Sequence, residues 1–122
     1  MAESPRILLI DDEPNILETG RRVLERAGYQ VCALDSAQAA LDLMRAERLD
    51  AVVTDIMMPE LSGVDLIEHI HDMLPDAAVV VMTGYGTDEV RAEMAGRGAR
   101  EFLAKPFTPT ELRTAVARAL GR

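Results

Sequence analysis

Short apolar runs and longer stretches of helical period alternate along the whole chain. The apolar runs are typical of strands buried on both faces of a sheet, and they cover residues 6–10, 29–33, 51–55, 78–82 and 101–104. Helical patterns follow the runs, with apolar residues on one side over residues 15–27, 40–44, 64–74, 88–95 and 108–120. Such alternation predicts a parallel sheet with right-handed crossovers. We therefore expect an α/β fold, a three-layer doubly wound sandwich of five strands and five helices, in one domain over residues 1–122.

The charge balance and the cysteine count exclude several classes of protein. The chain carries 13 basic and 21 acidic side chains, for a formal net charge of -8. Nucleic-acid binding needs a clustered basic face, so we expect no direct contact with nucleic acid, nor with anionic lipid. A single cysteine, Cys32, excludes an internal disulfide. No apolar run approaches the roughly 20 residues of a membrane span, and we expect a cytoplasmic domain without membrane contact.

Chemically active side chains lie at the carboxyl ends of the predicted strands, where doubly wound sheets bind their ligands. They are Asp11 and Asp12 after the first strand, Asp55 at the end of the third, Thr83 after the fourth and Lys105 after the fifth. Three crowded carboxylates repel one another unless a cation neutralises them, and Mg²⁺ accepts carboxylate, water and phosphate oxygens as ligands. An aspartate beside such an ion is a candidate nucleophile toward phosphorus. The hydroxyl and the ammonium can hold phosphoryl oxygens.

Four motifs in one register carry a family resemblance. They are Ile10-Asp11-Asp12-Glu13, Thr54-Asp55-Ile56-Met57-Met58-Pro59 with Gly63, Met82-Thr83-Gly84-Tyr85-Gly86, and Phe102-Leu103-Ala104-Lys105-Pro106-Phe107. With these motifs the chain resembles, from end to end, the receiver domain of two-component response regulators. The resemblance implies a flavodoxin-like fold with the strand order 2-1-3-4-5. It also implies a phosphorylation-dependent switch in signal transduction.

The resemblance further implies a phosphorylation site with a divalent cation. In such a site Asp55 accepts a phosphoryl group from a phosphohistidine of a sensor histidine kinase or of a phosphotransfer protein in a phosphorelay. Asp12 and Asp55 bind Mg²⁺ or Mn²⁺ directly, and the backbone carbonyl of Met57 is a third ligand. Asp11 reaches the ion through water.

A conformational switch is implied as well. Thr83 and Lys105 contact the phosphoryl group, and the peptide bond between Lys105 and Pro106 is expected to be cis. Phe102 occupies the position of the family's switch aromatic, with simple core packing as the alternative role. The response is expected on the face formed by the fourth helix, the fifth strand and the fifth helix. This face contacts an effector domain or protein, or a second phosphorylated copy.

The fourth predicted helix departs from the family pattern. Gly96 falls inside the usual helical span, and Arg97 replaces an apolar residue. An interior glycine costs a helix about 1 kcal/mol relative to alanine. We expect this helix to be short or frayed at its C-terminal end, and we hypothesise that phosphorylation orders or shifts it.

Other functions share parts of this pattern. A phosphatase of the haloacid dehalogenase type also uses a strand-end aspartate with Mg²⁺, but it needs a second aspartate at the position of Met57. A flavodoxin-like electron carrier needs a phosphate loop where Asp11-Asp12-Glu13 would repel a flavin phosphate. A receiver that binds partners without phosphorylation is a third alternative, which the intact acidic set disfavours. We therefore expect a signalling phosphoprotein that assists only its own phosphorylation and dephosphorylation, and not a turnover enzyme.

Overall fold

A five-stranded parallel sheet forms the centre of the structure, a computed structural model that describes residues 4–56, 63–84 and 88–121. The strands are β1 (Arg6–Ile10), β2 (Gln30–Leu34), β3 (Ala51–Asp55), β4 (Ala78–Thr83) and β5 (Ala99–Ala104). Their order across the sheet is β2-β1-β3-β4-β5, and each neighbouring pair is parallel. The predicted class and strand order are confirmed, although β2 lies one residue later than expected.

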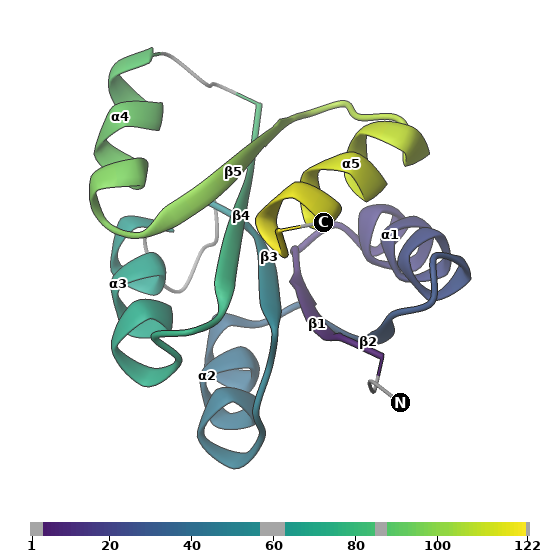
Figure 1. The fold of residues 1–122 in the computed structure, drawn as a ribbon, viewed down its shortest axis with the longest axis horizontal. Helices are drawn as coiled ribbons and strands as arrows, with labels where there is room; N and C mark the ends of the chain where they lie inside the picture. The colour runs from purple at the N-terminus through teal and green to yellow at the C-terminus, as the bar shows by residue number, and fades with distance from the viewer. Residues whose placement is uncertain (1–3, 57–62, 85–87, 122) are drawn as a thin grey trace.

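Helices connect the strands and cover both faces of the sheet. They are α1 (Pro14–Arg26), α2 (Ala37–Ala46), α3 (Gly63–Met73), α4 (Asp88–Gly96) and α5 (Pro109–Ala119). Figure 1 shows α1 and α5 on one face of the sheet and α2, α3 and α4 on the other, which is the predicted three-layer sandwich. No helix within the described ranges is long and apolar enough to cross a membrane.

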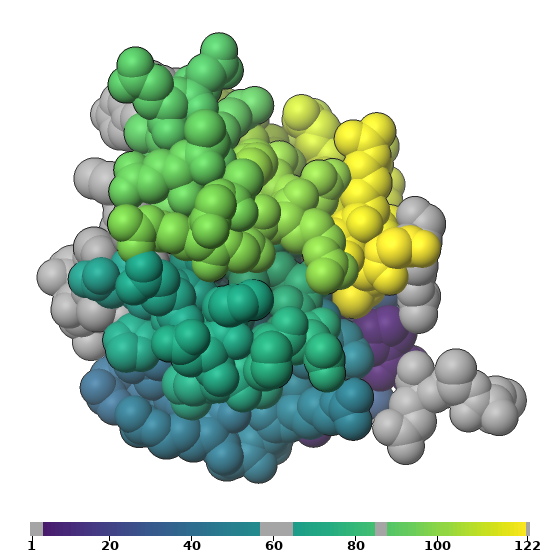
Figure 2. Space-filling model, turned by 60° about the vertical axis from the view of Figure 1, so that its left-hand side comes forward, coloured from purple at the N-terminus to yellow at the C-terminus, as the bar shows by residue number. Residues whose placement is uncertain are grey.

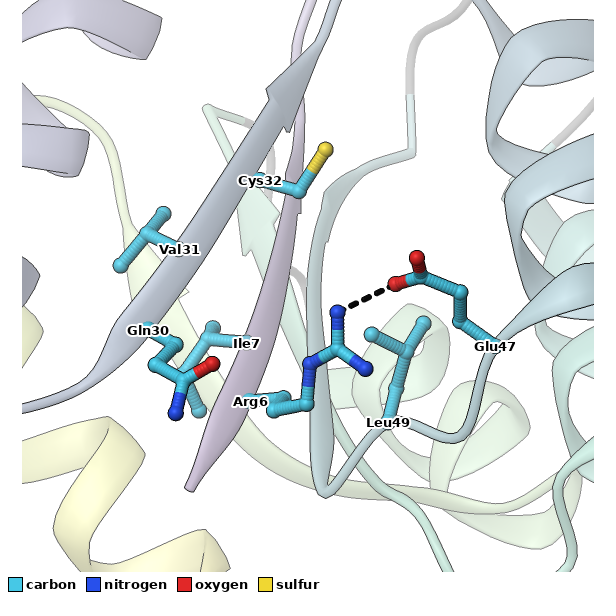
Figure 3. A pocket seen from close by; sticks show the side chains of 7 residues that line it. All are labelled: Arg6, Ile7, Gln30, Val31, Cys32, Glu47 and Leu49. Carbon is cyan, nitrogen blue, oxygen red and sulfur yellow. Dashed lines mark hydrogen bonds and ion pairs between the residues drawn. The ribbon is translucent and has the colours of Figure 1, made fainter. Parts of the chain in front are cut away.

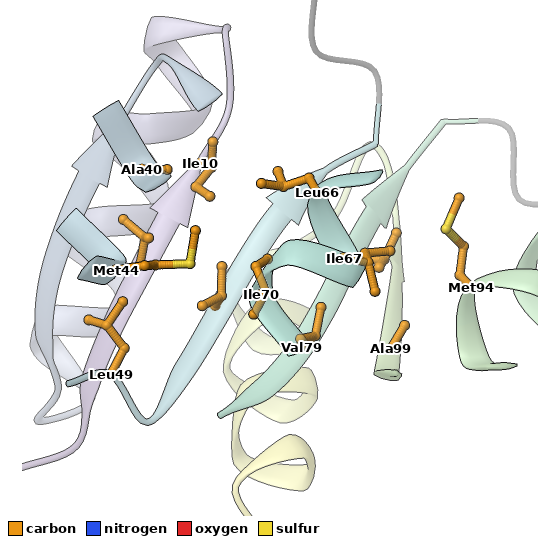
Figure 4. Close-up of a cluster of buried hydrophobic side chains, with 13 residues drawn as sticks. Ile10, Ala40, Met44, Leu49, Leu66, Ile67, Ile70, Val79, Met94 and Ala99 are labelled. Carbon is orange, nitrogen blue, oxygen red and sulfur yellow. The ribbon is translucent and has the colours of Figure 1, made fainter. Parts of the chain in front are cut away.

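The sheet separates two hydrophobic cores, because successive side chains of a strand point to opposite faces. We call the core under α2, α3 and α4 the α2–α4 core (Figure 4), and its strand residues are Leu8, Ile10, Val52, Val79, Val81 and Ala99. The core under α1 and α5 is the α1–α5 core, and its strand residues are Ile7, Leu9, Ala51, Val53, Ala78, Val80, Met82 and Leu103. A step of one residue along a strand therefore moves a side chain from one core to the other.

Two helix starts limit the segments that follow β1 and β5. Pro14 lies in the first turn of α1, where a missing N–H removes no helical hydrogen bond. At α5, the backbone N–H of Glu111 donates to Thr108 Oγ1 (3.1 Å), and the backbone N–H of Thr108 donates to Glu111 Oε1 (2.9 Å). This capping box determines where α5 begins. Only residues 105–108 are therefore left between β5 and α5.

β5 begins at Ala99, two residues before the predicted start. The pairing with β4 shifts register between Val79 and Val80, so Arg100 is the extra residue of a bulge. The guanidinium of Arg100 donates to the carbonyl oxygen of Ala119 at the end of α5 (2.8 Å). A charged residue at an irregular position interrupts the apolar pattern, and for this reason the sequence places the strand too late.

α4 is nine residues long, ends at Gly96 and is held by few apolar contacts. Met94 is its buried side chain, and Val90 packs at the edge of the α2–α4 core. Directly after the helix, Arg97 forms an ion pair with Glu68 of α3, and Figure 2 shows α4 stacked on α3. An exposed ion pair contributes at most about 1 kcal/mol. The helix is therefore short, as predicted, and weakly attached.

Candidate functional site

Three carboxylates meet at the carboxyl end of the sheet. Asp11 and Asp12 follow β1, and Asp55 is the last residue of β3. These strands are neighbours, and Ile10 lies opposite Thr54, so Asp11 and Asp55 lie side by side. Ligand oxygens of the three aspartates all lie within 4.8 Å of one another. Asp11 and Asp55 are 0% and 5% exposed, whereas Asp12 is open to solvent.

Lys105 lies between the two buried carboxylates. Its Nζ is 2.6 Å from Asp55 Oδ2 and 2.8 Å from Asp11 Oδ2. The backbone N–H of Lys105 donates to the carbonyl oxygen of Thr83 (2.9 Å), which extends the pairing of β4 and β5 beyond the last strand residue. The peptide bond between Lys105 and Pro106 is cis, the geometry that the resemblance implies. One ammonium thus balances part of the negative charge of the cluster.

Burial and charge shift two pKa values in this cluster. Burial raises the pKa of Asp11 above its ordinary 3.8, and the hydrogen bonds from Lys105 and from the backbone N–H of Glu13 (2.9 Å) oppose this only in part. Burial alone would lower the pKa of Lys105, but the hydrogen bonds and charges of Asp11 and Asp55 together raise it above 10.5. Lys105 is therefore a cation at neutral pH, whereas burial disfavours the anionic form of Asp11.

The donor set fits a divalent cation. Hard cations such as Mg²⁺ are bound by one or two carboxylates together with water and phosphate oxygens. Asp12 offers an exposed carboxylate, and Asp11 and Asp55 offer buried ones in the same cluster. The residues predicted for the cation site are therefore brought together, except for Met57, which lies outside the described residues.

Thr83 and Phe102 lie beside the cluster on β4 and β5. Thr83 ends β4, is 2% exposed and is paired with Ala104. Phe102 is paired with Val81 and packs, half-buried, at the edge of the α2–α4 core. The Arg91 guanidinium carbon of α4 lies 5.9 Å from the centre of the Phe102 ring, within the range of a cation–π contact. Phe102 thus links β5 to α4.

Two residues beside the acidic cluster, Glu13 and Thr54, were given no chemical role by the sequence motifs. Glu13 Oε1 lies 3.7 Å from Lys105 Nζ. The hydroxyl of Thr54, directly before Asp55, is buried at the end of β3 and donates to a backbone carbonyl. The only available signal in the sequence was adjacency to an aspartate of the cluster. The contact of Glu13 depends on a side-chain conformation, which a motif does not specify.

A cavity lies at the end of the sheet opposite the acidic cluster (Figure 3). Its volume is about 150 Å³, and it is lined by Arg6, Ile7, Gln30, Val31, Cys32, Glu47 and Leu49. Arg6 and Glu47 form an ion pair within it. Arg6 begins β1, whereas Asp11 follows the other end of that strand. This cavity is therefore separate from the acidic cluster.

Comparison with known proteins identifies the family. The profile of the response regulator receiver domain matches residues 7–117. The transcriptional regulatory protein DctD of Pseudomonas aeruginosa, named for C4-dicarboxylate transport, is 35% identical over 115 residues. That alignment covers 94% of this chain and 25% of DctD, so the chain spans about a quarter of this relative.

Solved structures agree. One similar structure is a response regulator of Burkholderia pseudomallei that was solved with a phosphorylated aspartic acid, a calcium ion and citrate. The two sequences are 33% identical, and the structures superpose with a TM-score of 0.85. The match covers 92% of this chain and 66% of the Burkholderia chain. The beryllofluoride-activated NtrC4 receiver domain dimer is 30% identical with a TM-score of 0.89, covering 95% and 96%. The chain belongs to the response regulator receiver family.

Proposed function

We propose that Asp55 is the phosphoacceptor of this receiver and that phosphorylation of this residue operates the switch. The observation that carries the proposal is the contact of the Asp55 carboxylate with Lys105, beside two further carboxylates at the sheet edge. An oxygen of Asp55 forms a bond to phosphorus while the P–N bond of a phosphohistidine breaks. The electron pair of that bond stays on the imidazole nitrogen of the donor. The protein is then a signalling phosphoprotein that acts only on its own phosphorylation state.

Asp12 and Asp55 would hold Mg²⁺ or Mn²⁺, with the Met57 carbonyl as a further ligand and Asp11 acting through water. The ion supplies positive charge for the phosphoryl oxygens when it is bound. Lys105 is close enough to Asp55 to bind one of these oxygens in the product. The calcium ion and phosphorylated aspartate of the Burkholderia pseudomallei regulator support this arrangement.

An apolar cleft beside Lys105 offers a docking surface for a protein that carries a phosphohistidine. It measures about 210 Å³ and is lined by Asn15, Ile16, Thr19, Lys105, Pro106 and Phe107. A sensor histidine kinase or a phosphotransfer protein that binds here brings its histidine close to Asp55. We propose a cytoplasmic location for the same reason, because such partners would have to meet the protein there.

The response is relayed to the face formed by α4, β5 and α5. The phosphoryl group adds a charge of about -1.5 to -2 beside Thr83, whose hydroxyl follows it. Phe102 passes the change to α4 through Arg91. A groove of about 340 Å³ on this face includes Arg91, Phe102 and Glu111 in its lining and offers a surface to an effector or to a second copy. The activated NtrC4 receiver dimer supports the second copy.

Incubation with Mg²⁺ and acetyl phosphate, followed by intact mass measurement, tests the proposal. We expect one phosphoryl adduct on the wild type and none on Asp55→Ala. Asp76→Ala is the matched control, because Asp76 is exposed near the start of β4, at the other end of the sheet, and should leave the adduct unchanged. A wild type without an adduct, or an adduct that survives Asp55→Ala, contradicts the proposal.

A further inference from the structure

The buried hydroxyl of Thr54 serves no evident purpose in the stability of β3. Thr54 is 0% exposed and lies between Ile10 on β1 and Val81 on β4, two apolar side chains. Val52, two residues earlier, packs in the α2–α4 core, so Thr54 points to the same face. Valine has the same shape and suits a strand equally well. A hydroxyl buried in such surroundings is unfavourable unless it is hydrogen-bonded.

The hydroxyl is hydrogen-bonded to the backbone of the phosphoacceptor. Thr54 Oγ1 donates to the carbonyl oxygen of Asp55 over 3.0 Å. The same peptide unit is held at its other end, where the backbone N–H of Ile56 donates to the carbonyl oxygen of Met82 on β4 over 3.4 Å. The second distance is long for a hydrogen bond of this type. The Thr54 hydroxyl, at the upper end of the usual O–H···O range, therefore restrains a peptide whose N–H is only loosely held.

We propose that Thr54 is a positioning residue for phosphorylation of Asp55, an inference that rests on the proposed function. The peptide between Asp55 and Ile56 determines ψ of Asp55, and the rotamers open to a side chain depend on φ and ψ. By restraining this peptide, the hydroxyl keeps the Asp55 carboxylate in the direction that places Oδ2 2.6 Å from Lys105 Nζ. Thr54 points into the core opposite the carboxylate and touches no reacting atom.

Two substitutions separate the hydroxyl from the methyl group. Thr54→Val keeps the shape and removes the donor, whereas Thr54→Ser keeps the donor and removes a buried methyl group. We expect Thr54→Val to slow phosphorylation by acetyl phosphate about tenfold, because a displacement of about 1 Å in a reacting group can cost up to 100-fold. Thr54→Ser should react within about twofold of the wild type at a temperature where all three proteins are folded.

The stabilities of the two variants should rank in the opposite order to their reaction rates, which separates a positioning role from a loss of stability. Urea unfolding should find Thr54→Ser less stable than Thr54→Val, since only the serine variant loses buried apolar volume. Reaction rates that follow the order of stability, or equal rates for Thr54→Val and the wild type, overturn the inference. Slow reaction in Thr54→Val with rescue in Thr54→Ser supports it.

A second measurement tests the role of Thr54 separately from the assignment of Asp55 as the phosphoacceptor. Mg²⁺ affinity, measured by titration calorimetry on the same three proteins, also depends on the direction of the Asp55 carboxylate. If the wild type takes no adduct, the assignment of Asp55 fails, and equal Mg²⁺ affinities then overturn the role of Thr54. Weaker binding in Thr54→Val alone would still show that the hydroxyl positions the Asp55 carboxylate, even though the role in phosphorylation falls with the assignment of Asp55.

Discussion

Lys105 Nζ lies 2.6 Å from Asp55 Oδ2, although the two residues are 50 positions apart in the chain. Lys105 is also the only lysine of the sequence, and the other twelve of its 13 lysine and arginine residues are arginines. The ammonium is a compact point charge, whereas a guanidinium is a planar fork that needs more space. The site between Asp11 and Asp55 thus holds the one lysine of the chain, which contacts both carboxylates from a single nitrogen atom.

Substitution of Lys105 should affect reaction and stability together. We expect Lys105→Met to slow phosphorylation by acetyl phosphate about 100-fold, because a donor to the developing negative charge is lost. The free energy of unfolding should fall by about 1–3 kcal/mol, since two buried carboxylates lose a charged partner. Intact mass over time and urea unfolding measure the two effects. Lys105→Arg keeps the charge, and a wild-type rate in this variant would show that the shape of the ammonium is unimportant.

Asp11 should make the protein less stable as pH rises in a solution without divalent cations. The pKa of Asp11 is raised in the folded state above its ordinary 3.8. At a pH between 3.8 and the pKa of the folded state, the folded protein therefore binds more protons than the unfolded chain. Stability therefore falls as pH rises through this interval. Asp11→Asn should be more stable than the wild type at neutral pH. This difference in the free energy of unfolding should vanish below pH 3.8. Urea unfolding across this range in EDTA provides the test, and a constant difference would refute it.

The two glycines at the end of α4 should respond oppositely to alanine. A Cβ at Gly96 would meet no atom within 4 Å, so Gly96→Ala should raise the free energy of unfolding by about 0.5–1 kcal/mol. Gly98 has φ of +118°, and its Cβ would lie 3.3 Å from His71 Nδ1. Gly98→Ala should therefore lower the free energy of unfolding by about 1–3 kcal/mol. Urea unfolding at neutral pH measures both, and equal signs would contradict this account of the helix end.

The apolar cleft should matter for a protein donor and not for a small one. We expect Phe107→Ala to slow transfer from a phosphohistidine protein about tenfold, because an aromatic side chain that anchors a docking contact can contribute about 1–2 kcal/mol. The rate with acetyl phosphate should change less than about twofold, since this donor needs no docking surface. Tyr29→Ala is the matched control, because Tyr29 packs at the edge of the same α1–α5 core just before β2, at the other end of the sheet. An equal loss with both donors would locate the effect in the reaction site.

Thr83 should couple the phosphoryl group to α4. Hydrogen exchange of residues 88–104, measured with and without beryllofluoride and Mg²⁺, should change in the wild type because the weakly attached helix is ordered or shifted. Thr83→Ala should bind the mimic without this change, whereas Thr83→Ser retains the hydroxyl and should restore it. Equal hydrogen exchange of the wild type with and without the mimic would show that α4 takes no part in the response.

Strand direction explains why most of the site could be predicted from the sequence. Asp55 and Lys105 lie at or just after the end of an apolar run, and parallel strands bring these ends to one edge of the sheet. An error at the start of a strand, as at Ala99, leaves that edge unchanged. The prediction therefore required only the number, direction and ends of the strands.

Contacts that depend on side-chain conformation or helix packing could not be predicted in this way. The position of Arg91 over Phe102 follows from how α4 lies against β5, and α4 has too few apolar residues to define a face from its sequence. The carbonyl oxygen that accepts from the Thr54 hydroxyl likewise depends on a side-chain rotamer, which the sequence pattern does not specify. The carbonyl of Met57 stays a prediction, because this residue lies outside the described part of the chain.

The alternation of side chains along each strand separates the residues of the candidate site into two groups, one on each face of the sheet. Asp11, Asp55 and Lys105 share a face with the α1–α5 core, whereas Thr83 and Phe102 share a face with the α2–α4 core. If the proposed roles are right, the reacting groups and the responding groups lie on opposite faces of the sheet, separated by one layer of backbone. A displacement on one face would then need to cross only one peptide unit to reach the other. A stiff sheet can for this reason transmit a signal across its thickness while its own hydrogen bonds stay intact.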